Sequence, residues 1–280
     1  MLKGPFLDRN WMGQNPDYNS ADIIMLGMPF DGTVSYRPGS RFAPEQIRLA
    51  SWSLEEYSPK FNKELSDCNF YDAGDLEFPL GNTKKSLEII KENVRQIYKD
   101  GKRILGVGGE HLVTYPVVAA ISEFYGDKLS IVHFDAHTDL RDEYLGEELS
   151  HSSVIKLCTK YVNPKNIRQI GIRSGTKEEW DYMQVNNTLV KKPSDLDGLE
   201  KVYITVDLDV LESSLMCGTG TPEAGGMTFN ELIDWFEYLK NFEIIGADAV
   251  ELSPDYDKSG VSTAVAAKVI RELLMIMPQK

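Results

Sequence analysis

Histidine and aspartate side chains, which can bind metal ions, gather in two short stretches of this sequence. The segment HFDAHTD (133–139) interleaves the two residue types, and VDLD (206–209) places Asp207 and Asp209 two residues apart. Imidazole and carboxylate groups together form sites for divalent cations. The pattern therefore predicts a metalloenzyme that holds more than one metal ion. All four histidines of the chain lie close together in sequence, at His111, His133, His137 and His151.

The spacing within these stretches indicates how the side chains can meet. Asp135, His137 and Asp139 are two residues apart, and side chains two apart on an extended segment point to the same side. Asp207 and Asp209 repeat this geometry, and one carboxylate can supply an oxygen to each of two cations. An oxygen-rich donor set of this kind favours two Mn²⁺ ions, whereas ligand type alone leaves Fe²⁺, Co²⁺ and Zn²⁺ as alternatives.

The rest of the chain alternates short apolar runs with longer amphipathic segments, which predicts a single domain over residues 1–280. We expect a three-layer α/β sandwich with a mostly parallel, about eight-stranded sheet between helices. The helix near 83–100 reads as capped by Thr83 and ended by Gly101. The other expected helices lie near 43–52, 113–125, 151–161, 176–186, 228–240 and 260–277. The expected strands are 23–30, 69–72, 103–108, 129–135, 167–173, 187–190, 201–207 and 244–252.

The polar clusters follow four of these strands. GVGGEH, HFDAHTD, VDLD and VELSPD each stand where a strand ends, and ligands of parallel α/β sheets bind beyond the carboxyl ends of the strands. Gly108 and Gly109 are expected to let the backbone approach closely before His111. A single aspartate in such a turn is more simply a solvated side chain. Convergence of four clusters on one edge favours a preformed site.

Composition narrows the classes of function. A formal net charge of −13 and a pI near 4.8 argue against binding to nucleic acid, which needs a basic face. The three cysteines, Cys68, Cys158 and Cys217, are widely spaced, so we expect neither disulfides nor zinc knuckles. The N-terminal residues lack the apolar core of a signal peptide, and no run approaches membrane-spanning length. We therefore expect a cytoplasmic protein without membrane contact.

Taken in order, the motifs resemble those of the ureohydrolase family, the arginases and agmatinases. The similarity runs from residue 29 to residue 257 and is carried by GGEH, HFDAHTDLR, LSHSS, VDLDVL, GTGTPEAGG and VELSPDYD. The chain departs from the usual pattern at Ser152, Glu212, Cys217 and Asp255, none of which is an expected metal ligand. The resemblance implies an arginase-like fold and a binuclear manganese hydrolase that cleaves a guanidino group to urea and an amine.

The resemblance also implies roles for individual residues. A metal-bridging hydroxide attacks the guanidinium carbon, His151 shuttles the proton, and Glu251 pairs with the guanidinium. His133 is outside the implied ligand set, and either a buried, hydrogen-bonded histidine or one that supports a ligand fits it. One metal is implied to bind His111, Asp135, Asp139 and Asp207, and the second Asp135, His137, Asp207 and Asp209.

Substrate choice depends on the segment after DAHTD. DAHTDLRDEYLGEELSH is closest to bacterial agmatinases, which implies hydrolysis of agmatine, a small cationic guanidino compound, to putrescine and urea. Arg141 is a candidate substrate contact, compensated by the acids at 142, 143, 147 and 148. Guanidinobutyrate, arginine and formimidoylglutamate are alternatives, with Arg141 or Arg173 holding a carboxylate. A non-catalytic metal-binding regulator is less favoured, since all six expected ligands are present.

The resemblance also bears on assembly. Family members form trimers or hexamers, so a homo-oligomer is expected.

Overall fold

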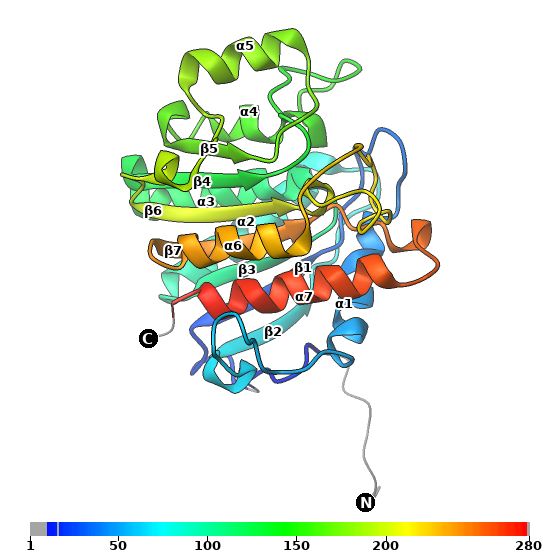
Figure 1. Ribbon diagram of the computed structural model, residues 1–280, viewed down its shortest axis with the longest axis vertical. Helices are drawn as coiled ribbons and strands as arrows, with labels where there is room; N and C mark the ends of the chain where they lie inside the picture. Colours follow the sequence, from blue (N-terminus) through cyan, green and yellow to red (C-terminus); the bar gives the residue numbers. More distant parts are fainter. Residues whose placement is uncertain (1–9, 16, 279–280) are drawn as a thin grey trace, which may run out of the picture.

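The computed structural model describes residues 10–15 and 17–278, and a parallel β-sheet runs through the middle of the molecule (Figure 1). Seven strands in the described residues form this sheet in the order β2-β1-β3-β7-β6-β4-β5. Every pair of neighbours is parallel. The strands are β1 (Ile23–Met28), β2 (Phe70–Asp75), β3 (Arg103–Gly108), β4 (Leu129–Phe134), β5 (Ile167–Ile170), β6 (Lys201–Asp207) and β7 (Glu243–Val250).

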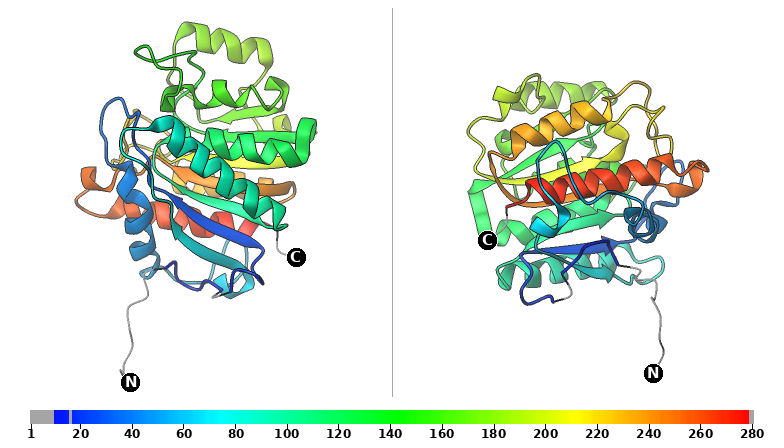
Figure 2. Two further views of the ribbon diagram at one scale, coloured as in Figure 1. Left: turned by 180° about the vertical axis from the view of Figure 1, so that it is seen from behind. Right: turned by 60° about the horizontal axis from the view of Figure 1, so that its bottom comes forward.

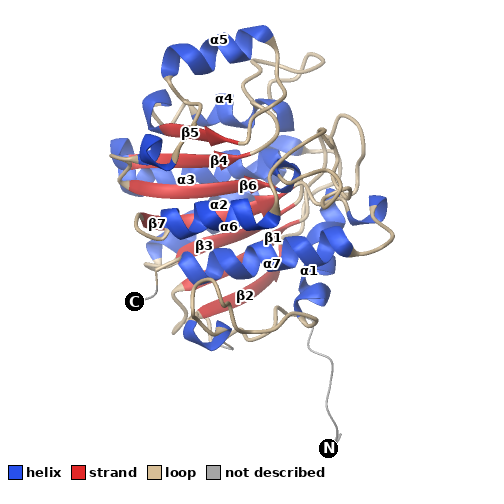
Figure 3. Cartoon of the chain, in the orientation of Figure 1, coloured by secondary structure: helices blue, strands red, loops and turns tan. Residues whose placement is uncertain are grey.

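Helices cover both faces of the sheet and complete the three layers predicted from the sequence (Figures 1, 2 and 3). One apolar cluster lies between the sheet and α1, α6 and α7, and the other lies between the sheet and α2, α3 and α4. The central strands are buried on both faces, which explains their near-continuous valine and isoleucine runs. The helices are α1 (Ala43–Ser51), α2 (Thr83–Lys99), α3 (Thr114–Tyr125), α4 (Val154–Cys158), α5 (Lys177–Asn186), α6 (Phe229–Leu239) and α7 (Val261–Ile276).

The expected strand at 187–190 is absent, which accounts for seven strands rather than about eight. Asn187 ends α5 in the left-handed conformation with φ 53°, and the Thr188 amide donates to the Met183 carbonyl. These residues therefore belong to the helix end. What is left forms a single parallel bridge between Gln169 and Leu189.

Two helix boundaries also differ from the prediction. The side chain of Asn82, not Thr83, caps α2 by accepting from the Lys85 amide at 3.0 Å. Gly101 follows the helix with φ 72°, as a terminating glycine should. The expected helix at 151–161 is a short 3₁₀ turn (His151–Ser153) followed by α4. This turn places His151 at the start of the segment, on the edge where the polar clusters lie.

The four polar clusters end up side by side. They follow β3, β4, β6 and β7, which are consecutive in the sheet order β3-β7-β6-β4. Because all strands run in one direction, their carboxyl ends share an edge (Figure 1). The sheet therefore brings together residues that lie up to about 140 positions apart, as in the bond between His111 and Glu251. Across the described residues, every helix is too short or too polar to span a membrane.

Candidate metal centre

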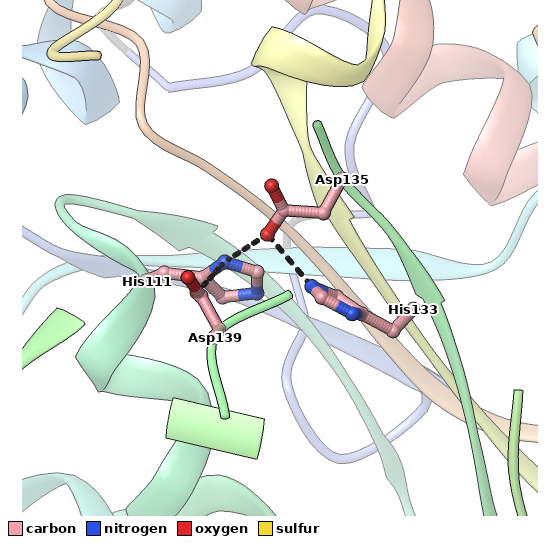
Figure 4. A group of neighbouring side chains, drawn as sticks. All are labelled: His111, His133, Asp135 and Asp139. Atoms are coloured by element: carbon pink, nitrogen blue, oxygen red, sulfur yellow. Dashed lines mark hydrogen bonds and ion pairs between the residues drawn. The ribbon is translucent and has the colours of Figure 1, made fainter. Parts of the chain in front are cut away.

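Three carboxylates surround one nitrogen of His111, in the turn after β3, and Figure 4 draws two of them, those of Asp135 and Asp139. His111 Nδ1 lies 3.1 Å from Asp135 Oδ2, and 3.3 Å from both Asp139 Oδ2 and Asp207 Oδ2. All four residues are buried. Figure 4 shows Asp135 between His111 and His133, with Asp139 entering from the opposite side. Carboxylate oxygens grouped around an imidazole nitrogen are the kinds of atom that bind divalent cations.

A second group forms around His137. Its Nδ1 lies 2.9 Å from Asp209 Oδ2 and 3.4 Å from Asp135 Oδ1. Asp135 therefore turns one oxygen to each imidazole. Asp207 was expected in both groups, but its Oδ2 faces His111 whereas its Oδ1 accepts from the Asp209 amide at 2.9 Å. The structure thus places two donor groups next to each other, with Asp135 common to both.

Two of these polar atoms, His111 Nδ1 and Asp209 Oδ2, are fully enclosed and form no well-aligned hydrogen bond with the described residues, although groups of opposite charge lie close to them. The other nitrogen of His111, Nε2, lies 2.9 Å from the Thr205 hydroxyl oxygen, which can accept a hydrogen bond from it. Burying polar atoms without well-aligned partners is costly, and a divalent cation would satisfy both His111 Nδ1 and Asp209 Oδ2. Oxygen and imidazole donors at this spacing fit a pair of divalent cations.

The electrostatics of the cluster also call for positive charge. Burial, together with the charges of Asp209 and Asp135, raises the pKa of Asp207 well above its usual value. Burial and the charge of Asp135 also raise the pKa of Asp139 and of Asp209. Burial alone would lower the pKa of His137, but its hydrogen bonds to Asp135 and Asp209 raise it to about 12. These carboxylates can all be ionised together only if positive charge, from protonated imidazole rings or from metal cations, lies among them.

Glu251 and Asp139 adopt a backbone conformation that is rare for residues other than glycine. Their φ angles are 68° and 52°, and such strain concentrates at functional sites. Glu251 is held by its amide, which donates to Gly109 at 2.8 Å, and by its Oε1, which accepts from the His111 amide at 2.7 Å. An added Cβ at Gly109 would lie 1.9 Å from the Phe30 carbonyl oxygen, confirming the close approach predicted there.

His151 lies beside this centre and is held on three sides. Its Nδ1 is 3.5 Å from Glu251 Oε1, its Nε2 is 3.0 Å from the Ser35 hydroxyl, and its amide donates to the Thr33 hydroxyl at 3.0 Å. Burial would lower the pKa of His151, but the Glu251 carboxylate raises it to about 9. The raised pKa favours the protonated ring, which can give up a proton.

Thr33 connects His151 to a further buried acid, Glu110. Glu110 accepts from the Thr33 amide at 2.9 Å and from the Thr33 hydroxyl. Burial and the charge of Glu251 raise the pKa of Glu110 to about 8. Sequence reasoning assigned no role to Thr33, Ser35 or Glu110. The first two lie in the PFDGTVSYR segment, and their contacts with His151 span more than 100 positions, which no local pattern reveals.

A cavity of about 260 Å³ opens above the donor groups. Arg141 lies in its wall, as expected for a substrate contact, with its guanidinium 5.3 Å from the centre of the Tyr144 ring. The buried carboxylate of Glu179 lies in the same wall and had not been singled out, because in the sequence it is only the third residue of α5. The lining also includes Ser35, His137, Thr138, Asp139, His151, Ser152, Ser174, Gly175, Thr176, Asp207 and Thr221.

Arg173, the other candidate for binding a substrate carboxylate, binds the protein backbone instead. Its guanidinium donates to backbone carbonyls, two of the shortest being those of Asp209 at 2.7 Å and Glu223 at 3.0 Å. It thereby ties the 218–226 loop to the turn after β6. That loop helps to shape the pocket, since Thr221 lines the cavity.

The fold and this pair of donor groups define a class of hydrolase, and the family model described as Arginase family matches residues 21–276. The chain belongs to the arginase family.

Within it, the chain is 45% identical to the agmatinase of Bacillus subtilis (strain 168) over 276 residues, which cover 95% of each protein. It is 43% identical to the agmatinase of Bacillus anthracis, with 93% of each protein covered. The crystal structure of the agmatine ureohydrolase of Thermoplasma volcanium matches with a TM-score of 0.86 and 28% identity. That alignment covers 97% of this chain and 94% of the other.

Proposed function

We propose that this protein is an agmatinase, which hydrolyses agmatine to putrescine and urea. The observation that carries the proposal is the pair of donor groups that share Asp135 beside the cavity, all of them buried except the partly exposed His137. The proposed substrate follows from the relatives named agmatinase, because they align with nearly the whole chain.

We assign six residues as ligands of two divalent cations, with Mn²⁺ as the native metal. Asp135 and Asp207 are shared in this assignment, and the geometry supports the sharing most directly for Asp135. When bound, the two cations would supply Lewis acidity that activates a water molecule for attack on the electrophilic guanidino carbon. The ligands are His111, Asp135, Asp139 and Asp207 for one cation, and Asp135, His137, Asp207 and Asp209 for the other.

The remaining chemistry belongs to His151 and Glu251. Cleavage breaks the bond between the guanidino carbon and the nitrogen of the aliphatic chain, and that nitrogen must gain a proton to leave. His151 lines the cavity and its raised pKa favours the protonated ring, so we assign it to deliver this proton. Glu251 Oε2 has no partner among the described residues, and a carboxylate oxygen of this kind pairs well with a planar guanidinium.

The far end of agmatine is an ammonium group, and Glu179 is the wall residue that suits it. Its carboxylate is fixed by the amides of Leu140, at 3.1 Å, and Thr176, at 2.6 Å, and retains capacity for a further donor. Arg141 stays a proposed substrate contact because it lies in the same wall. It favours a second class of substrate, in which the tail ends in a carboxylate.

The experiment is urea release by protein loaded with Mn²⁺, measured for agmatine, arginine, guanidinobutyrate and formimidoylglutamate. Formamide is measured in parallel. We expect urea and putrescine from agmatine and little product from the others. Turnover of guanidinobutyrate in preference to agmatine would assign tail recognition to Arg141. Failure to turn over any of the four with two metals bound would exclude this substrate class and leave the non-catalytic metal-binding protein as the alternative.

We further propose a cytoplasmic homo-oligomer, a trimer or a hexamer, that does not bind nucleic acid. The net charge of −13 supports the last point, because binding to phosphates needs a basic face. Sedimentation velocity on the purified protein measures the assembly.

A further inference from the structure

We propose that His133 is a positioning residue that orients the shared carboxylate of Asp135 by donating a hydrogen bond to it, and is not itself a metal ligand. The inference rests on the metal centre of the proposed function but not on its substrate. Its physical consequence is tighter metal binding.

Distance alone leaves the role of His133 open. The residue is fully buried on β4, and its Nε2 lies 2.7 Å from Asp135 Oδ2. Its potential ligand atom is within 4.8 Å of those of His111, Asp135 and Asp139, so it is close enough to join a metal site (Figure 4). A ring nitrogen binds a metal only through a free lone pair. The position of the proton on His133 therefore decides between the two roles.

The side-chain amide of Gln169 decides where that proton lies. Gln169 Nε2 is 2.8 Å from the Thr138 carbonyl oxygen, which can only accept, so this end of the amide must be the NH₂ group. The opposite end agrees, because the Thr188 hydroxyl donates to Gln169 Oε1 at 2.9 Å. The amide is thus fixed in one orientation.

The second N–H of Gln169 then reaches His133. Gln169 Nε2 lies 3.2 Å from His133 Nδ1, which must accept the bond. A neutral imidazole with an accepting Nδ1 carries its proton on Nε2. The Nε2–H accordingly donates to Asp135 Oδ2, and both nitrogens of His133 are in use.

Asp135 is thereby held at both oxygens. Oδ2 accepts from His133, and Oδ1 accepts from the His137 amide at 2.6 Å. Each oxygen keeps a second lone pair, one on the side of His111 and one on the side of His137. Partners of this kind orient metal ligands before the metal arrives, and their loss typically weakens metal binding roughly 10–100-fold.

The short segment after α5 takes part in this arrangement. The backbone of Gln169 accepts from the Val190 amide at 2.9 Å and donates to the Thr188 carbonyl at 2.8 Å. This single bridge to the sheet places the Thr188 hydroxyl against the Gln169 side chain. The segment therefore supports the orientation of Gln169 rather than extending the sheet.

The test compares His133→Leu with His133→Gln. Glutamine places an NH₂ donor at about the reach of Nε2, whereas its amide nitrogen is no metal ligand. Equilibrium dialysis against Mn²⁺, followed by elemental analysis, gives the number of bound ions and their affinity. We expect His133→Leu to weaken binding roughly 10–100-fold and His133→Gln to restore most of that loss.

Two further variants keep the test decisive. Val132→Ala removes a buried side chain from the same strand without touching the metal centre, so it should lower the melting temperature and leave Mn²⁺ affinity unchanged. If His133→Leu does not fold, Gln169→Met frees His133 Nδ1 from its donor and should weaken Mn²⁺ binding in the same direction.

Unchanged Mn²⁺ affinity in His133→Leu, or in Gln169→Met where that variant replaces it, would overturn the inference. Equal losses in His133→Leu and His133→Gln would identify the imidazole as a ligand and overturn it as well. A wild-type protein that binds two Mn²⁺ ions yet releases no urea would refute the proposed function alone, because these binding measurements would still stand.

Discussion

The imidazole of His151 sits between Glu251 and Ser35, and this surrounding sets its protonation. Glu251 holds the pKa of His151 near 9, so the protonated form persists through neutral pH and is lost as the pH rises through that value. Bound cations repel the imidazolium and move the loss to a lower pH. A residue that gives a proton in the reaction therefore limits activity on the alkaline side.

We expect kcat to fall as the pH rises, with a midpoint at or below about 9. His151→Asn should keep its metals and lose both most of the turnover and this alkaline limb. The measurement is kcat from pH 6 to pH 10 at saturating Mn²⁺ and agmatine. An identical alkaline limb in the variant would remove His151 from the proton transfer.

The hydroxyl of Thr33 accepts from the His151 amide and donates to Glu110. Thr33→Val preserves the shape but leaves both partners without this bond. We expect kcat to fall about tenfold, equivalent to about 1.4 kcal/mol, with little change in KM or in bound metal. Thr33→Ser keeps the hydroxyl and should recover most of the rate. Equal kcat values for the valine and serine variants would show that the hydroxyl does not position His151.

At the scale of elements, the turn after β3 depends on a close contact between two backbones. Gly109 and Glu110 donate to the carbonyls of Met28 and Phe30, which leaves no room for a side chain at position 109. This turn carries both Glu110 and His111. Its geometry therefore positions a proposed metal ligand, His111, together with Glu110, which Thr33 connects to His151.

Gly109→Ala should destabilise the protein by about 3 kcal/mol, because its Cβ would overlap the Phe30 carbonyl. Gly198→Ala provides the contrast, since its Cβ would meet nothing within 4 Å and only its φ of 89° opposes the change. That variant should lose only about 1–2 kcal/mol, the cost of placing a Cβ in the left-handed region. Chemical denaturation measures both, and a milder effect at Gly109 than at Gly198 would contradict this account of the turn.

Much of this architecture could be predicted from the sequence because it depends on local patterns. Apolar runs located seven of the eight expected strands, and the residues that follow them located the acids and imidazoles of the site. The contacts of Thr33 and Ser35 with His151 could not be predicted, since they join segments more than 100 positions apart. The position of the His133 proton likewise depends on Gln169, which lies on a different strand.

At the scale of the whole molecule, two apolar clusters pack against opposite faces of one sheet, and we expect a single domain. The metal centre lies where four neighbouring strands of that sheet end. Metal binding should therefore stabilise the entire fold rather than one loop. A ligand that binds only the native state adds about 2.7 kcal/mol when present at one hundred times its dissociation constant.

Removal of metal with a chelator should lower the melting temperature by several degrees and leave one cooperative transition. Readdition of Mn²⁺ should restore the original value. The measurement is differential scanning calorimetry of the chelated and reconstituted protein. Two separated transitions in either state would contradict the single domain, and an unchanged melting temperature would contradict the coupling of metal to the fold.

The proposed metal ligands lie at the ends of buried strands, whereas the loop that contains Arg141, here called the rim, lies at the surface. This difference affects how such a protein can change over generations. The rim turns at Leu145 and Gly146, both with positive φ, and Leu145 is 89% exposed. Mutations there meet few packing constraints, whereas those at the ligands meet many. Descendants of one ancestor can therefore acquire new substrate preferences by drift and selection in the rim while they inherit the same hydrolytic centre.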